Sequence, residues 1–475
     1  MSDPVQDGGG REAGAPPPAG PARWREVFRG ALGRLTLGLF LLEVVGAVEI
    51  LVVTTVMPRV VRDLGGLRLY GLAFSAAGLA TVMAIPLTGR AVDRVGPIRP
   101  LAIMLGVFAG GTVLAGAAPN MPVFVAGRFL QGLGAGAQFA VSIGTVAKVY
   151  PDGLRPRVLA LLAAAWVVPG LIGPSFGALM ASTVGWRWAF FALVPLIGLS
   201  GALVFPGLAS VAGADDAAAA VTSIRWPVQT ALGSAALLGG LSDFGPWTGA
   251  LVAAGLLLAV PGIRHLVRNA AAGSQVGLGW ALAAGFLLGF TFFATDGFVP
   301  LLLTRVRHLT VAQASVVITL ATLGWSAGSW WQSRVATSIS AGRLVGASTV
   351  AVILGTLGVA AGAYDAPLLF PYAGWTLAGL GMGVAYPTVY LATMERAGPG
   401  AEASTVALLL LIDSLGSAVG TGLGGGAVAL SESLKASLVA GLTGAFALAL
   451  AAACALTVLS PKLSGAGPPA TPSAA

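Results

Sequence analysis

Fourteen apolar runs follow one another along the chain, and each has roughly the length of a helix that crosses a lipid bilayer. Such a helix needs about 20 predominantly apolar residues. The runs lie at residues 34–57, 68–89, 98–118, 121–147, 157–182, 186–206, 227–243, 247–266, 277–303, 311–333, 343–364, 367–393, 403–429 and 435–460. Only 9% of the residues are charged, whereas an ordinary soluble domain has about 25%. The predicted fold class is therefore an all-α polytopic membrane protein with 14 transmembrane helices.

The basic residues between the runs predict the orientation, because Lys and Arg accumulate in cytoplasmic connections. With the N-terminus in the cytoplasm, 18 Lys and Arg fall on the cytoplasmic side and 7 on the outer side, and Arg128 lies within a run. We expect both termini to be cytoplasmic, in a bacterial inner (plasma) membrane. The net charge of +8 is dispersed among the connections rather than gathered in one patch, so it does not indicate nucleic-acid binding.

The polar stretches divide the chain into segments. The longest polar connection separates six runs from the rest, and both ends are rich in Gly, Pro and Ala, which is typical of disorder. The predicted segments are a disordered cytoplasmic N-tail at 1–33, a six-helix bundle at 34–206, a cytoplasmic linker at 207–226, two additional transmembrane helices at 227–266, a second six-helix bundle at 277–460 and a cytoplasmic C-tail at 461–475.

The connection between the second and third runs is charged and rich in turn residues. From Gly89 to Arg99 it reads Gly-Arg-Ala-Val-Asp-Arg-Val-Gly-Pro-Ile-Arg. Gly89 permits tight helix contact, and Gly96 permits a sharp turn. Asp93 can pair with a neighbouring helix end, and Arg94 and Arg99 add positive charge on this side.

Arg128 lies about seven residues inside the fourth run, in the stretch Arg-Phe-Leu-Gln-Gly-Leu-Gly-Ala-Gly. An arginine within the membrane costs about 2.5–3.5 kcal/mol on insertion scales. We therefore expect its side chain to face a polar cavity or a carboxylate.

The fifth run concentrates small residues around a proline, at Gly170, Gly173, Pro174 and Gly177. Gly173 and Gly177 are four residues apart and share a helix face, so they allow close packing. Pro174 is expected to add a kink.

Together these three stretches resemble motifs of the major facilitator superfamily. The first is similar to its loop motif G-x-x-x-D-R-x-G-x-x-R, and the second to R-x-x-Q-G-x-G-x-G on its fourth helix. The third resembles the antiporter motif G-x-x-x-G-P-x-x-G-G, with Pro169 and Ala178 standing where Gly is usual. The overall pattern is similar to that of fourteen-helix drug/proton antiporters, and its motifs lie in residues 49–190.

The resemblance implies the major facilitator fold, with two six-helix bundles plus two extra central helices. It implies that the loop from Gly89 to Arg99 is a latch that holds the outward-open state, and that the fifth helix blocks proton leak. Members with fourteen helices carry an Asp nine residues before a proline at the end of the first helix. Glu49 takes that place before Pro58, so a protonatable group is kept.

Four acidic residues lie well inside runs. Burial raises the pKa of a carboxyl group and a nearby arginine lowers it, so such a group can couple proton flow to transport. We predict that Glu49 and Arg128 form the proton switch and that Asp413 also takes part in proton coupling. Glu43 and Asp296 are predicted to contribute to substrate binding, or Asp296 to an outer gate. A purely structural role as a hydrogen-bonded neutral acid stays open for each.

Aromatic residues are the remaining candidates for substrate binding. Tyr386 and Tyr390 are four residues apart on one helix face, and Trp375 lies in the same run. Aromatic faces bind cationic amphiphiles by stacking and cation–π contact.

The sequence has no phosphate-binding loop, metal-ligand pair or nucleophile motif, so we predict no enzyme activity, no cofactor and no metal. The predicted function is proton-coupled export of amphipathic drugs or other hydrophobic or cationic small molecules by a monomer that alternates access. Its partners would be the substrate, protons and the lipid bilayer. Two alternatives stay open, namely export of acylglycerol-type lipids and a membrane receptor or scaffold that transports nothing.

Overall fold

The computed structural model describes residues 24–151, 153–208, 224–242, 245–271, 277–398 and 402–464, and every regular element within these ranges is helical. The remaining residues of the predicted tails and linker, at 1–23, 209–223 and 465–475, lie outside this description.

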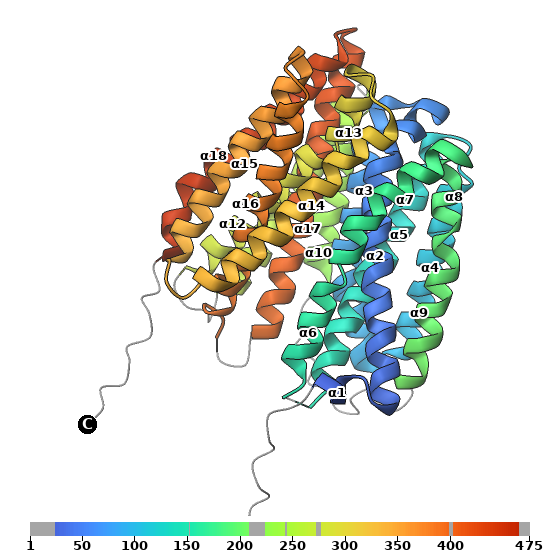
Figure 1. Cartoon of the computed structure of the whole chain (residues 1–475), viewed down its shortest axis with the longest axis vertical. Helices are drawn as coiled ribbons and strands as arrows, with labels where there is room; N and C mark the ends of the chain where they lie inside the picture. Colours follow the sequence, from blue (N-terminus) through green and yellow to red (C-terminus); the bar gives the residue numbers. More distant parts are fainter. Residues whose placement is uncertain are drawn as a thin grey trace, which may run out of the picture.

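The helices follow the order of the apolar runs (Figure 1). They are α1 (Trp24–Val27), α2 (Gly30–Leu64), η1 (Leu67–Leu69), α3 (Tyr70–Val95), α4 (Ile98–Gly116), α5 (Met121–Val149), α6 (Arg155–Ala164), α7 (Val167–Thr183), α8 (Trp186–Phe191), α9 (Leu193–Leu208), α10 (Arg225–Ser242), α11 (Thr248–Ala271), α12 (Leu278–Asp296), α13 (Val299–Leu301), η2 (Leu302–Val306), α14 (Val311–Val335), α15 (Ala341–Ala361), η3 (Gly362–Tyr364), α16 (Leu369–Met394), α17 (Glu402–Ser433), α18 (Leu438–Leu459) and η4 (Ser460–Ser464).

The all-helical, multi-pass architecture is confirmed, but the count of fourteen membrane spans is not. Within the described residues, 12 helical segments are long and apolar enough to cross a membrane. Helices α5 and α10 are not among them. Polar residues such as Arg128, Gln131 and Gln138 lower the hydropathy of α5. Fourteen spans therefore stays a prediction.

Proline explains two helix breaks inside apolar runs. A helix interior needs an N–H that donates to the carbonyl four residues earlier, and proline has none. Pro169 leaves the carbonyl of Ala165 without this bond, and the chain breaks there between α6 and α7. Pro300 stands in the same relation to Asp296, where α12 ends. The second break places the carboxylate of Asp296 at a helix end.

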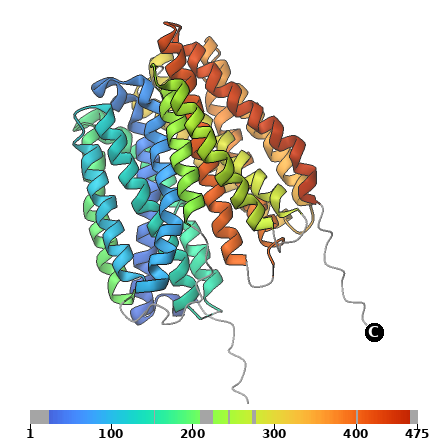
Figure 2. The ribbon, with the colours of Figure 1, turned by 180° about the vertical axis from the view of Figure 1, so that it is seen from behind.

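The helices form two bundles and one additional pair (Figures 1 and 2). Helices α2 to α9 pack on one another, and α12 to α18 form the second group. Helix α10 lies beside α3 and α17, where the two bundles meet, and α11 packs against α10. The added pair therefore covers the outside of the junction rather than separating the bundles.

The two bundles touch at one end of the molecule and diverge toward the other (Figures 1 and 2). We call the end that holds the turn between α3 and α4 the latch end, and the opposite one the distal end. At the distal end the Tyr70 hydroxyl donates to the carbonyl of Gly297 at 2.8 Å. Nearby, α3 and α17 approach so closely that a Cβ on Gly71 would lie 2.5 Å from Cα of Gly425. The molecule is therefore closed at its distal end.

Short parts of both predicted tails lie in helices that pack on the bundles. Residues 24–33 include α1 and the start of α2, and Val27 is fully buried, with its carbonyl accepting a hydrogen bond from Thr36 at 2.9 Å. At the other terminus Leu463 is buried in η4, and its carbonyl accepts from Arg396. Packing of these apolar side chains orders segments whose composition alone is typical of disorder.

Candidate functional site

Glu49 of α2 and Arg128 of α5 form an ion pair in the interior of the first bundle. Their exposed fractions are 4% and 3%. The guanidinium group of Arg128 donates to Glu49, to the side-chain oxygen of Gln131 at 2.8 Å and to the carbonyl of Ala73 at 3.3 Å. Gln131 in turn donates to the Thr112 hydroxyl at 3.1 Å. The structure thus brings the two residues of the predicted proton switch together, and their role in proton transfer stays a prediction.

Glycines on α5 bring this helix close enough for the pair to form. A Cβ on Gly132 would collide with the carbonyl oxygen of Ala77 on α3, and one on Gly127 would lie 2.7 Å from the backbone nitrogen of Ala115 on α4. Small residues let helix backbones approach in this way. The glycines on either side of Arg128 therefore position the arginine.

A polar stripe continues along α5 toward the latch end. Gln138, Ser142 and Thr145 are spaced by four and three residues, so they share one helix face. Each is at most 5% exposed, and within the described residues Gln138 and Thr145 each have a side-chain polar atom with no hydrogen-bond partner. The half-buried carboxylate of Glu43 on α2 lies near Ser142 and Trp166. Buried polar atoms of this kind normally bind water.

Sequence analysis missed this stripe, although its spacing was visible. Within an apolar run, polar residues repeated at intervals of three and four indicate one polar face of a helix. Glu43 was predicted to bind substrate, but it lies beside this stripe rather than beside the aromatic candidates of the second bundle.

In the second bundle, Asp413 of α17 lies against two tyrosines of α16. The Tyr386 hydroxyl donates to the Asp413 carboxylate at 2.9 Å, and the hydroxyls of Tyr386 and Tyr390 are 3.1 Å apart. The two rings stack with centroids 4.8 Å apart. Gly289 of α12 lets α17 approach, since a Cβ there would lie 2.6 Å from Asp413 Oδ1. Both tyrosines are half-buried, so the predicted carboxylate and aromatic groups form one partly accessible cluster.

A column of rings connects this cluster with Asp296. Tyr386 contacts Trp325 at 5.4 Å between centroids, Trp325 contacts Phe292 at 5.3 Å, and Phe292 stacks on Trp375 at 4.7 Å. The Trp375 indole N–H then donates to Asp296 at 3.0 Å. The sequence did not distinguish Phe292 as a candidate residue, because it lies in an apolar run with several other phenylalanines.

Trp375 and Asp296 are enclosed in this state, and their predicted role as substrate contacts stays a prediction. Trp375 has an exposed fraction of 0% and Asp296 one of 9%. The indole ring is enclosed by its stack on Phe292 and its hydrogen bond to the carboxylate. In this state the pair supports the bundle at its distal end, while Tyr386 and Tyr390 remain partly accessible.

The predicted latch motif lies at the end where the bundles diverge. Gly96 has φ +75°, as the predicted sharp turn requires, and Arg94 and Arg99 are exposed. Asp93 pairs with Lys148 of α5 at 3.3 Å, which is within its own bundle. In this state a Cβ on Gly89 would meet nothing within 4 Å among the described residues, so the tight helix contact there stays a prediction. The two bundles diverge toward this end (Figures 1 and 2).

The small residues of α7 pack this helix against two others. A Cβ on Gly173 would lie 3.1 Å from Leu51 of α2, and one on Gly177 would lie 3.4 Å from Thr55 of the same helix. Gly170 instead faces Thr322 of α14, in the other bundle. Pro174 is buried within α7. This helix therefore contacts both bundles, and its predicted role in preventing proton leak remains a prediction.

Comparison with known proteins adds family information to this geometry. Residues 39–421 match the family model described as Major Facilitator Superfamily. Probable multidrug-efflux transporters from two strains of Mycobacterium tuberculosis are 29% identical over 408 residues, which cover 82% of this chain and 86% of theirs. Multidrug resistance protein 3 of Bacillus subtilis is 27% identical over 166 residues, or 35% of this chain and 32% of that protein.

Solved structures share the fold at low sequence identity. A D-xylose-proton symporter superposes with a TM-score of 0.65 at 12% identity, over 91% of this chain and 97% of its own. A bacterial homologue of the human lysosomal transporter Spinster, in an inward-facing and unoccupied conformation, gives a TM-score of 0.61 at 15% identity, over 90% and 95% of the two chains.

Proposed function

The chain belongs to the major facilitator superfamily, and on that basis we propose that it exports amphipathic or cationic small molecules in exchange for protons by alternating access. It is a multi-pass membrane protein of a transporter family rather than an enzyme. The similarity to probable multidrug-efflux transporters over most of both chains supports the substrate class.

The buried pair of Glu49 and Arg128 is the observation that carries the proposal. A buried carboxylate that loses its cationic partner costs about 3–5 kcal/mol if it stays charged. Glu49 therefore favours the ionised form while Arg128 is in contact and favours proton uptake when the two separate. A change of carrier state that moves α5 relative to α2 would bind or release a proton, and that is the coupling which an antiporter needs.

Asp413 and its tyrosines supply a site for the exported molecule. A carboxylate next to stacked aromatic rings attracts an organic cation by charge and by cation–π contact. The side-chain partner of Asp413 is the Tyr386 hydroxyl rather than a cation, so the ionised carboxylate could pair with a cationic substrate. Protonation of the same carboxylate would weaken the binding of a cation.

The orientation follows from the distribution of basic residues. The latch end carries the connections that are rich in Lys and Arg, which we assign to the cytoplasm together with both termini. The closed distal end then faces outward, and we assign the structure to an inward-facing state of a monomer in a bacterial inner membrane. The pairing of Asp93 with Lys148 of its own bundle agrees with a released latch.

Dye uptake by proteoliposomes tests the exchange. Vesicles with an acidic interior are diluted into a more alkaline buffer, so that protons leave while a monovalent cationic dye enters. For one proton exchanged per dye cation, the inside-to-outside ratio should rise about tenfold per pH unit of gradient. Dye accumulation that ignores the gradient would refute proton exchange.

Substitutions in the ion pair test whether it couples proton movement to dye accumulation. Glu49→Gln should abolish accumulation against the gradient while downhill dye movement persists, and Arg128→Ala should abolish accumulation as well. Asp365→Asn is the matched control, because Asp365 is exposed and its φ of +59° suits asparagine. If Glu49→Gln and Arg128→Ala still accumulate dye at the full rate, the pair is not the coupling site.

A further inference from the structure

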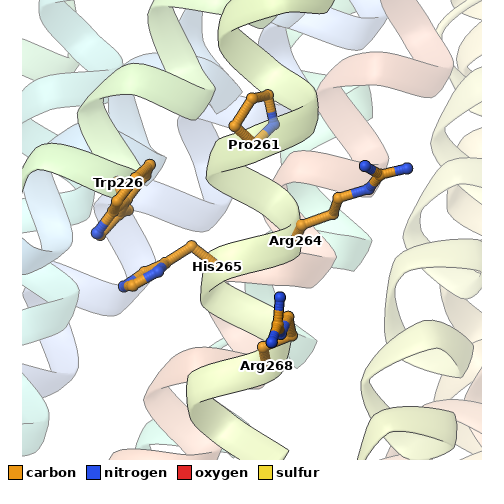
Figure 3. A pocket seen from close by; sticks show the side chains of 5 residues that line it. All are labelled: Trp226, Pro261, Arg264, His265 and Arg268. Carbon is orange, nitrogen blue, oxygen red and sulfur yellow. The ribbon is translucent and has the colours of Figure 1, made fainter.

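A pocket of about 400 Å³ lies between α10 and α11 at the latch end, away from Glu49 and Asp413. Figure 3 shows its five lining residues, with Trp226 on one helix and the others on the next. They are Trp226, Pro261, Arg264, His265 and Arg268. Three of the five are basic and none is acidic. The pocket therefore favours an anionic group.

An aromatic stack forms one wall of this pocket. The rings of Trp226 and His265 lie parallel within 25°, with centroids 4.1 Å apart. The guanidinium carbon of Arg225 lies 5.0 Å from the centroid of the Trp226 ring, which adds a positive charge near this wall. Arg264 and Arg268 are both exposed, so their guanidinium groups are available to a ligand.

The apolar surface of α11 continues directly from the pocket. Pro261, Arg264 and Arg268 follow Leu257 by four, seven and eleven residues, so all four lie on one face of the helix. Leu257 is 75% exposed and its neighbour Leu258 is 41% exposed. Leu257 and Arg264 are about 10 Å apart along the axis, at 1.5 Å per residue. One helix face thus presents an apolar surface and then a basic one.

From this arrangement we propose that the pocket binds the headgroup of an anionic phospholipid. The phosphate and any second anionic group lie between Arg264 and Arg268, and the acyl chains run along Leu257 and Leu258. A soluble anion would use the basic residues but not the leucines, whereas a phospholipid uses both. The assignment to the cytoplasmic leaflet rests on the orientation proposed above, and lipid binding itself does not.

Native mass spectrometry of the full-length protein in detergent measures this binding with defined lipids. The protein is titrated with dioleoyl phosphatidylglycerol or with dioleoyl phosphatidylcholine, which differ in headgroup charge but not in acyl chains. We expect a clear preference for phosphatidylglycerol. Arg264→Gln/Arg268→Gln should weaken its binding about thirty-fold, since each basic residue near a membrane surface contributes about 1 kcal/mol.

Two further double variants distinguish lipid binding in the pocket from a general effect of positive charge at this end. Arg334→Gln/Arg343→Gln removes two positive charges from the same end and should leave lipid binding unchanged. Arg264→Lys/Arg268→Lys keeps the charge and should retain most of the binding. The proposal is overturned if the Arg264 and Arg268 variants bind phosphatidylglycerol like the parent, or if the control loses as much affinity. It is also overturned if inorganic phosphate binds the pocket as tightly as the lipid does.

Discussion

The contact between Gly71 and Gly425 allows a direct test of how the distal end closes. These glycines lie on α3 and α17, one in each bundle, and their backbones touch. A Cβ on Gly425 would lie 2.5 Å from Cα and 2.9 Å from the nitrogen of Gly71. The change Gly425→Ala therefore perturbs the junction with a single methyl group.

The size of the effect follows from these distances. Two carbon atoms pack at about 3.5–4.0 Å, so α3 and α17 must separate by about 1 Å to admit the methyl group. This separation also stretches the hydrogen bond from Ser75 to the carbonyl of Ala418, which is 2.8 Å long. Overpacking of this kind costs about 1–3 kcal/mol. If the bundles are apart here in a state that is open at the distal end, this free-energy cost destabilises only the closed state. The equilibrium between the two states then shifts about 5–150-fold toward the open one.

Pulsed electron resonance between two spin labels measures this shift. Val184 and Leu434 are 58% and 70% exposed and lie at the distal end of opposite bundles. Each is replaced by a labelled cysteine after Cys454→Ser removes the one natural cysteine. We expect Gly425→Ala to raise the population with the longer label distance by the factor given above. The larger side chain of Gly425→Val should raise it further.

Gly106→Ala is the matched control, because a Cβ at Gly106 would meet nothing within 4 Å. It adds the same methyl group and the same helix propensity, so the label distances should not change. If Gly425→Ala gives the same distance distribution as this control, close packing of α3 on α17 does not determine the closed state.

Two other substitutions test the remaining contacts. Asp413→Asn should raise KM about ten- to hundred-fold for cationic dyes and much less for neutral substrates, since a hydrogen-bonded charged group contributes about 1.5–3 kcal/mol; equal losses for both substrate types would argue against charge recognition. Gly132→Val should lower the thermal unfolding midpoint of the purified protein, because its side chain collides with Ala77 inside one bundle. Gly144→Ala, where a Cβ has open space, should leave that midpoint unchanged.

The ion pair in the first bundle could be predicted because an arginine within a membrane helix is stable in few environments. Arg128 within a membrane helix requires a carboxylate or a polar cavity, and few acids in the sequence were within reach. Glycines flank this arginine in the sequence, and the structure shows close helix contacts at Gly127 and Gly132. Sequence could not show how far the bundles stand apart at the latch end, which decides whether Gly89 touches a neighbour. That separation is a property of one conformational state, and the amino-acid sequence alone does not determine it.

The second bundle was predictable in its residue types but not in their partners. Tyr386 and Asp413 come from different helices, as do Trp375 and Asp296. The rotation of each helix about its axis decides which side chains meet, and tertiary packing sets that rotation. The run at 277–303 also concealed a break, and the missing N–H of Pro300 places Asp296 at a helix end. Sequence therefore named the aromatic candidates, while Trp375 proved to be enclosed.

The two buried carboxylates differ in their partners, and this difference suggests how the proposed exchange divides between the bundles. Glu49 already has a cation in contact, so a cationic substrate would have to displace Arg128 before it could pair there. The Asp413 carboxylate accepts from the Tyr386 hydroxyl rather than from a cation, so an organic cation would gain more by binding next to it. Proton exchange at Glu49 and substrate binding at Asp413 must then communicate across the junction between bundles. Helix α7 is suited to this role, because Gly173 and Gly177 pack on the helix of Glu49 while Gly170 faces Thr322 in the second bundle.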